Sequence, residues 1–216
     1  MIKFEISDAL YSDELENYVT KITGEINIDT DDNEPICAGK IKATYLDLAT
    51  ALNHGEWMFD LFEHHSQATY ECYEALFVEG STEHDYLEKK LMKDYGICWP
   101  STWSNLLYID KVEVYPAYRG KFLGLATINR LIQKFGHECA LIVLKAFPLQ
   151  FESDPKYPSV GLLKITDEQK RATKKLKSHY KKIGFHVIPK SDYMYYCPDT
   201  DRRPRISDLG FEEPYL

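Results

Sequence analysis

The residues best suited to chemistry lie in a short basic turn between a predicted strand and a predicted helix. Residues 119–124 read RGKFLG and follow the strand-forming segment NLLYIDKVEVYP. A helix N-terminus presents N–H groups without helical acceptors and a partial positive charge, so it favours an anion. Arg119 and Lys121 add positive charge, and Gly120 and Gly124 allow a ligand to approach the backbone closely. The turn therefore predicts a cradle for a pyrophosphate.

Neither common phosphate-binding motif, G-x-x-x-x-G-K-[ST] or G-x-G-x-x-G, is present. The segment VEVYPAYRGKFLGLATINRLIQKF instead resembles the acyl-CoA-binding motif of the GNAT superfamily of N-acyltransferases, which reads V-x-V-x-P-x-x-R-G-x-G-x-G/A. Arg119 and Gly124 match the ends of its [QR]-x-x-G-x-[GA] core, while Phe122 replaces the usual glycine. Downstream, CALIVLKAF is similar to the next family strand and HYKKIGFHVI to the Y-x-x-x-G-F element. We expect a helical backbone at Phe122 to tolerate its side chain.

The resemblance implies an N-acetyltransferase that uses acetyl-CoA as co-substrate and transfers the acetyl group to an amine by direct attack, without a metal. The backbone of Val112, Glu113 and Val114 would pair with the pantetheine arm. The residues implied to bind the pyrophosphate are Arg119, Gly120, Lys121, Phe122, Leu123, Gly124, Leu125 and Ala126. These roles come from the resemblance and not from spacing alone.

Two catalytic roles remain to be assigned. Tyr180 matches the family tyrosine near the thioester sulfur, and a phenol of pKa near 10 can protonate a departing thiolate. The candidates for the general base are Glu113 and Asp110, and we prefer Glu113. Strand alternation places the two side chains on opposite faces, so we expect at most one of them to point at the acceptor. The simpler alternatives are a core tyrosine and two solvated strand carboxylates.

Alternation and helical periodicity predict the elements that position this turn. Two strands surround an acidic turn at 29–35, and an apolar stripe predicts one helix from Trp57 to Leu76. A helix follows from Ser81 or Thr82 to Gly96, with Asp85 completing a capping box. The rest of the chain is predicted to form, in order, a strand at 105–115, a helix from 125 to Gly136, a buried strand at 139–147, a loop at 148–166, a helix at 168–182 and two last strands.

This order indicates an α/β (α+β) fold, and the resemblance implies a mixed, mostly antiparallel sheet flanked by helices with an N-terminal elaboration. We expect one domain over 1–216, with a hairpin and helical acceptor-side region in 1–104 and an acyl-CoA-binding core in 105–216. Family members usually place their first helices before the hairpin, whereas here residues 56–94 follow it. The acceptor is therefore the least constrained part of the prediction.

Charge and composition limit the function classes. Hydrophobic residues make up 44% of the 216 residues, enough for a packed core. The net charge of −8 disfavours a general nucleic-acid binder. Residues 1–100 hold 21 Asp/Glu against 7 Lys/Arg, a balance of −14, which favours a cationic acceptor, although the carboxylates could serve solubility alone. Residues 164–190 hold nine Lys/Arg against two carboxylates, a balance of +7.

Because of that basic segment, a toxin-like member that acetylates aminoacyl-tRNA remains an alternative function. Phe122 in place of the usual glycine leaves a second alternative, an inactive acyl-CoA-binding or interaction module. A homodimer is compatible with either. The five scattered cysteines suggest a reducing cytoplasm, and no membrane segment or signal peptide is expected. His64, His65 and Cys72 are not spaced as metal ligands; we expect a satisfied core His65 and an exposed His64.

Overall fold

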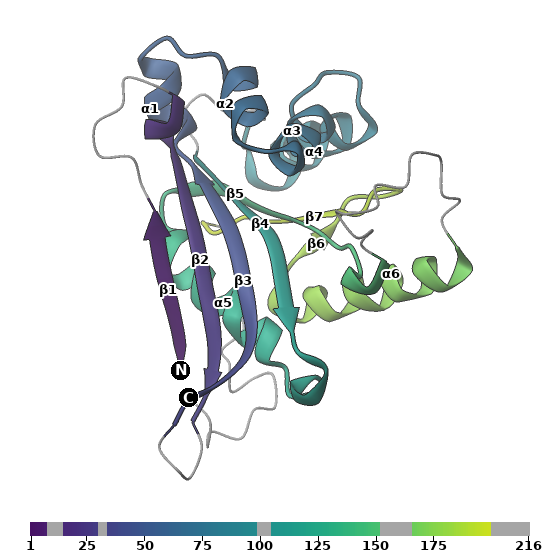
Figure 1. The fold of residues 1–216 in the computed structure, drawn as a ribbon. Helices are drawn as coiled ribbons and strands as arrows, with labels where there is room; N and C mark the ends of the chain where they lie inside the picture. Colours follow the sequence, from purple (N-terminus) through teal and green to yellow (C-terminus); the bar gives the residue numbers. More distant parts are fainter. Residues whose placement is uncertain (8–14, 30–33, 99–104, 152–165, 200–216) are drawn as a thin grey trace.

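The part of the chain that the structure describes forms one seven-stranded sheet with helices on both faces (Figure 1). The computed structural model describes residues 1–7, 15–29, 34–98, 105–151 and 166–199. The strands are β1 (Ile2–Ser7), β2 (Val19–Ile28), β3 (Ile36–Leu46), β4 (Asn105–Val114), β5 (Cys139–Lys145), β6 (His186–Val187) and β7 (Tyr193–Tyr196). Their order is β1-β2-β3-β4-β5-β7-β6, and of the described pairs only β4–β5 is parallel. The expected mixed, mostly antiparallel sheet is confirmed.

Six α-helices are described: α1 (Leu48–Asn53), α2 (Met58–His65), α3 (Gln67–Leu76), α4 (Thr82–Tyr95), α5 (Leu123–Phe135) and α6 (Asp167–Tyr180). Short 3₁₀ helices cover 15–18, 116–118, 149–151 and 181–183. The predicted hairpin is confirmed as β2 and β3, and β1 is an additional edge strand that the sequence analysis missed. Residues 30–33 of the acidic turn, 152–165 of the predicted loop and the tail from 200 lie outside the described residues.

The prediction of one helix from Trp57 to Leu76 is wrong, because the chain breaks at Ser66 into α2 and α3. Ser66 is extended, with φ −168° and ψ 158°, and its hydroxyl accepts a hydrogen bond from the N–H of Thr69 at 3.2 Å. A serine side chain caps a new helix in this way and so competes with continuation of the old one. Trp57 is 75% exposed and does not belong to the buried stripe.

Helix α4 begins and ends as predicted. The Ser81 hydroxyl accepts from the N–H of His84, and Gly96 ends the helix in the left-handed conformation with φ 69°. The predicted capping box is wrong, because the Asp85 carboxylate accepts instead from the N–H of Gly80 at 3.3 Å. Helix α5 starts two residues earlier than predicted, at Leu123.

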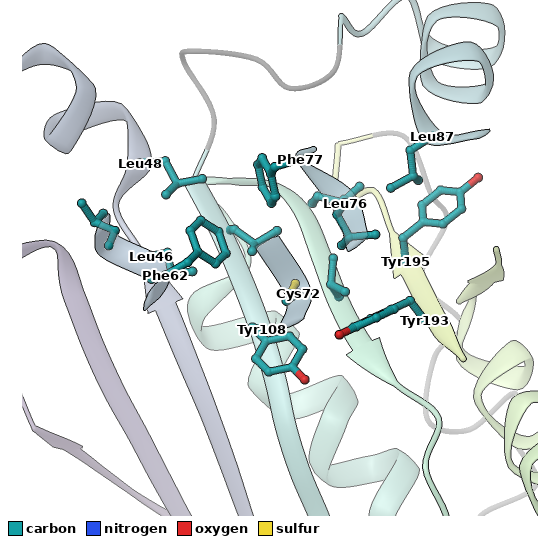
Figure 2. Close-up of a cluster of buried hydrophobic side chains, with 14 of the residues drawn as sticks. Leu46, Leu48, Phe62, Cys72, Leu76, Phe77, Leu87, Tyr108, Tyr193 and Tyr195 are labelled. Carbon is teal, nitrogen blue, oxygen red and sulfur yellow. The ribbon is translucent and has the colours of Figure 1, made fainter. Parts of the chain in front are cut away.

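The sheet buries a different apolar cluster on each face. Leu106 and Tyr108 of β4 point towards α1–α4, as Figure 2 shows for Tyr108, whereas Leu107 and Ile109 pack with α5 and α6. Strand β5 is buried on both faces, as its continuous apolar run predicts. This alternation fixes the face on which each site residue lies.

Candidate functional site

Strands β4 and β5 pair over only part of the length of β4. Their parallel pairing joins Asn105–Ile109 to Cys139–Leu144, and β5 ends at Lys145. Strand β4 continues to Val114, held on its other side by β3 through pairs such as Val114 with Gly39. No described strand pairs with the β5-side edge of Val112–Val114. An open strand edge is a template for an extended ligand with amide groups.

A β-bulge stands where the two strands part. Lys42 of β3 pairs with Lys111 and Ala43 pairs with Ile109, so Asp110 is an extra residue in β4. A bulge bends its strand and interrupts simple alternation. The alternation argument that placed Asp110 and Glu113 on opposite faces therefore fails.

Beyond the bulge, contacts with α5 show on which face of the sheet each side chain of β4 lies. A Cβ atom on Gly124 would meet Val112 Cγ1 at 3.6 Å and Val114 Cγ2 at 3.5 Å, so both valines face α5. Glu113 lies between them in the strand and therefore points to the opposite face. It is half-buried there.

The turn after β4 has the backbone of an anion site. Gly120 and Phe122 are left-handed, with φ 83° and 56°, and the first helical bonds of α5 run from the N–H groups of Leu125 and Ala126 to the Phe122 carbonyl at 2.9 and 3.1 Å. Within the described chain, the N–H groups available to a ligand are those of Gly120, Lys121, Leu123 and Gly124, which make no hydrogen bond. Successive free N–H groups at a helix start form an anion-binding concavity.

Phe122 does not have the helical backbone that we predicted. Its φ of 56° is a left-handed conformation, which a glycine adopts easily and a phenylalanine rarely takes. The ring stacks on His179 with centroids 6.0 Å apart and planes 10° apart, and Lys182 Nζ lies 4.9 Å from its centroid. These contacts attach the turn to the end of α6.

The predicted pyrophosphate residues therefore separate into groups with different contacts. The Arg119 Nε donates to the Val114 carbonyl at 3.0 Å, which ties the turn to the end of β4, and its side chain is exposed. Lys121 is exposed as well. Leu125 and Ala126 bury their side chains and already use their N–H groups within the helix. A ligand would meet residues 119–124 more directly than these two.

Tyr180 is the last residue of α6 and lies on the same face of the sheet as α5. It is half-buried against Phe185, with ring centroids 6.4 Å apart, and its hydroxyl has no hydrogen-bond partner in the described chain. Burial raises the pKa of Tyr180 to about 12, so the hydroxyl stays protonated at neutral pH. The two predicted catalytic side chains thus lie on opposite faces of the sheet.

A cavity of about 260 Å³ lies apart from this turn, between β2 and α2. Its lining residues are Ser7, Leu15, Glu16, Val19, Lys21, Leu61, His64 and His65. His65 Nε2 is 3.1 Å from Thr44 Oγ1, so this side chain has a hydrogen-bond partner as predicted, but it is half-buried and not part of the core. His64 is exposed, as predicted. Burial, and then the charges of Lys21 and His64, lower the pKa of His65.

The described residues contain neither a candidate metal site nor a candidate membrane span. In that part of the chain no three His, Cys, Asp or Glu residues are grouped as a metal site. None of the helices described is both long and apolar enough to cross a membrane.

Comparison with known proteins gives only distant similarity. No family model matches the chain, and no curated protein matches it significantly. One similar solved structure is a mutant of KacT, with 8% sequence identity and a TM-score of 0.39 over 85% of this chain and 73% of that chain. Another is a KacTA–DNA complex, with 9% sequence identity and a TM-score of 0.40 over 93% of this chain and 95% of that chain. A third is an N-acetyltransferase from Staphylococcus aureus, with 15% sequence identity and a TM-score of 0.30 over 83% of this chain and 69% of that chain. Because these sequence identities and TM-scores are low, the solved structures assign no role to any residue of this chain, and the roles proposed below depend on the geometry of the site itself.

Proposed function

We propose that this protein is an acyl-CoA-dependent N-acetyltransferase. One observation carries the proposal: the open edge of Val112–Val114 leads directly into the anion site at the start of α5. Coenzyme A carries an amide-containing pantetheine arm attached to a pyrophosphate. With the pyrophosphate at residues 119–124, the arm would run back along β4, and the thioester would lie near the point where β4 and β5 part.

The proposed reaction is direct attack of a neutral amine on the thioester carbonyl. The C–N bond forms, the C–S bond breaks, and the amine loses a proton to a base. Burial raises the pKa of Tyr180 to about 12, above the value of about 8.5 typical of a thiol. Tyr180 would therefore stabilise the developing thiolate mainly by donating a hydrogen bond, and the thiolate could leave without complete proton transfer.

The base is better sought at Asp110 than at Glu113. Glu113 follows the last paired residue, Ile109, by four positions, which corresponds to about 13 Å along a strand. Asp110 is the bulged residue next to Ile109, so its carboxylate begins close to the expected thioester. Glu113 stays a prediction from the sequence, and the variants Asp110→Asn and Glu113→Gln separate the two assignments.

Two exposed lysines provide the test of the cofactor site: Lys121 in the turn before α5 and Lys134 in the last turn of that helix. Lys121→Glu places a carboxylate beside the free N–H groups of the turn, whereas Lys134→Glu makes the same charge change in the last turn. A lost charged contact corresponds to about 1.5–3 kcal/mol, or roughly 10- to 150-fold in affinity. Calorimetry should show CoA binding weakened at least tenfold by Lys121→Glu and nearly unchanged by Lys134→Glu. Equal affinities in both variants would contradict the site.

Turnover is tested separately, by release of free thiol from acetyl-CoA with a panel of amines. The proposal expects amine-dependent thiol release and an acetylated amine in equal amounts. CoA binding without turnover on any amine would instead favour the binding-module alternative.

A further inference from the structure

An ion pair joins helix α3 to the end of strand β5. Lys145 is the last residue of β5, and its Nζ lies 2.9 Å from Oε2 of Glu71 in α3. Lys145 faces the α1–α4 side of the sheet, because it is paired with Tyr193 of β7, which belongs to the apolar cluster on that side. The side chains of Lys145 and Glu71 are 35% and 43% exposed. The pair is therefore partly shielded and still reachable from solvent.

This ion pair lies at the point where β4 and β5 part. Ile109 and Leu144 are the last paired residues of the two strands, and Lys145 is the next residue of β5. Beyond this point β4 continues to Val114 with no described strand on its β5 side. A ligand on the α1–α4 side can therefore approach a thioester that lies along the free edge of β4. The proposed CoA site, in the turn before α5, leaves that approach to the acceptor.

Both charged groups keep hydrogen-bonding capacity for a ligand. A lysine ammonium has three N–H donors, and a carboxylate has two acceptor oxygens. Within the described residues, Lys145 Nζ makes one hydrogen bond, to Glu71 Oε2, and Glu71 Oε1 accepts none. Lys145 Nζ also lies 5.6 Å from the centroid of the Tyr193 ring, a cation–π contact that restricts its position. A negative and a positive group are thus held side by side at the proposed reaction centre.

Two tyrosine hydroxyls lie near the pair. Tyr193 is 5% exposed, and its hydroxyl is buried without a hydrogen-bond partner in the described chain. Figure 2 shows its side chain directed from β7 towards Tyr108 of β4. Burial first, and then neighbours that include Cys72 and Glu71, raise the pKa of both hydroxyls, so they stay protonated and can donate. A carboxylate bound at Lys145 would bring an acceptor to the side of Tyr193, where a buried hydroxyl without one is unfavourable.

A zwitterion matches this arrangement better than a simple cation does. Glu71 attracts the ammonium group of a cationic amine, but Lys145 beside it repels the same group. In an α-amino acid a single carbon atom separates the ammonium from the carboxylate. Both charges can therefore face the ion pair together, each opposite its counter-ion.

We propose that the acceptor is an α-amino acid, with its ammonium group bound by Glu71 and its carboxylate bound by Lys145. This inference rests on the proposed acetyltransferase function and replaces the expectation of a cationic acceptor. The nitrogen gives one proton to the base before it attacks the thioester carbonyl. It loses a second proton as the C–N bond forms and the C–S bond breaks. The products are an N-acetylamino acid and CoA.

The first experiment measures thiol release from acetyl-CoA with each standard amino acid and with its α-amide. The amide keeps the amine and the side chain and lacks the negative charge. Its amine is the less basic of the two, so intrinsic reactivity at neutral pH favours the amide, and a preference for the acid must come from the protein. At least one amino acid should exceed its amide tenfold in kcat/KM, as for one charged hydrogen bond. Equal values, or higher values for the amides throughout, would overturn the proposal.

Single variants assign the two charges. Lys145→Gln should reduce the preference for the acid to near one without lowering kcat/KM for the amide. Glu71→Gln should lower kcat/KM for the acid and the amide alike, at least tenfold. Lys90→Gln is the matched control, because Lys90 forms an ion pair with Asp94 on α4, away from the site, and it should keep the preference. A preference that survives Lys145→Gln, or that Lys90→Gln removes equally, would overturn the proposal.

Exchange of the two charges separates acceptor binding from a purely structural ion pair. The double variant Glu71→Lys/Lys145→Glu keeps one residue of each charge but reverses their positions. A link that only holds α3 on β5 tolerates this exchange, whereas a bound amino acid would have its amine and carboxylate interchanged. Circular dichroism should show an unchanged fold, and kcat/KM for the preferred amino acid should fall at least tenfold. Full activity in this variant would contradict the proposal.

Direct binding separates this inference from the proposed function. Calorimetry with the preferred amino acid and saturating CoA, which has no acetyl group to transfer, should show binding that Lys145→Gln weakens at least tenfold. If CoA binds and amides are acetylated as well as amino acids, the acetyltransferase proposal stands and only the amino-acid inference fails. If CoA does not bind, the acetyltransferase proposal fails and the acceptor role fails with it, whereas amino-acid binding that depends on Lys145 is still measured without CoA.

Discussion

Replacing Phe122 by glycine and by alanine tests the backbone on which the anion site depends. Both variants remove the ring and with it the same contacts, the stack on His179 and the approach of Lys182. Their difference therefore reports the backbone conformation at position 122. In ordinary helix or strand, alanine is more stable than glycine by about 0.5–1 kcal/mol, because glycine loses more entropy on folding.

At a φ of 56° the order should reverse. A left-handed conformation costs a non-glycine residue about 1–2 kcal/mol, which exceeds the entropic cost of glycine. Phe122→Gly should then be more stable than Phe122→Ala by about 0.5–1 kcal/mol. For a chain of this size that difference corresponds to about 1–4 °C in Tm.

Thermal unfolding followed by circular dichroism measures this order, and calorimetry with CoA tests its consequence. Phe122→Gly should bind CoA more tightly than Phe122→Ala, since glycine keeps the turn in its binding conformation. If alanine is as stable as glycine, or more so, the left-handed turn does not exist in solution. The account of Phe122 as a substitute for the family glycine would then be refuted.

Two further predictions concern catalysis. Tyr180→Phe should lower kcat about 10²- to 10³-fold with nearly unchanged CoA affinity, as for loss of one transition-state hydrogen bond; an unchanged kcat would make Tyr180 structural. Asp110→Asn should lower kcat at least tenfold more than Glu113→Gln when both are measured by thiol release, and the reverse order would return the base to Glu113.

Local patterns predicted the elements of the site, and long-range pairing decided its details. The strand before Pro116, the helix that ends at Gly136 and the caps at Ser81 and Gly96 were predictable, because periodicity and cap chemistry are local. Strand β1 was missed although Ile2, Phe4 and Ile6 alternate with polar residues. That alternation was a signal that could have been used.

Other features required the structure. The bulge at Asp110 and the opposition of Lys42 and Lys111 depend on the register between β3 and β4, which no single strand encodes. Phe122 adopts a conformation that phenylalanine rarely takes, stabilised by contacts with residues nearly sixty positions away. The break at Ser66 interrupts a stripe whose periodicity continues across it. In each case a long-range or cap contact overrode the local pattern.

Hydrogen–deuterium exchange with and without CoA tests the central claim most directly. The account predicts that CoA slows exchange of backbone amides in two adjacent segments, 112–114 at the open edge of β4 and 120–124 at the start of α5, and that Lys121→Glu reduces both effects. Protection confined to other parts of the chain, such as the cavity beside His65, or no protection at CoA concentrations that saturate binding, would contradict it.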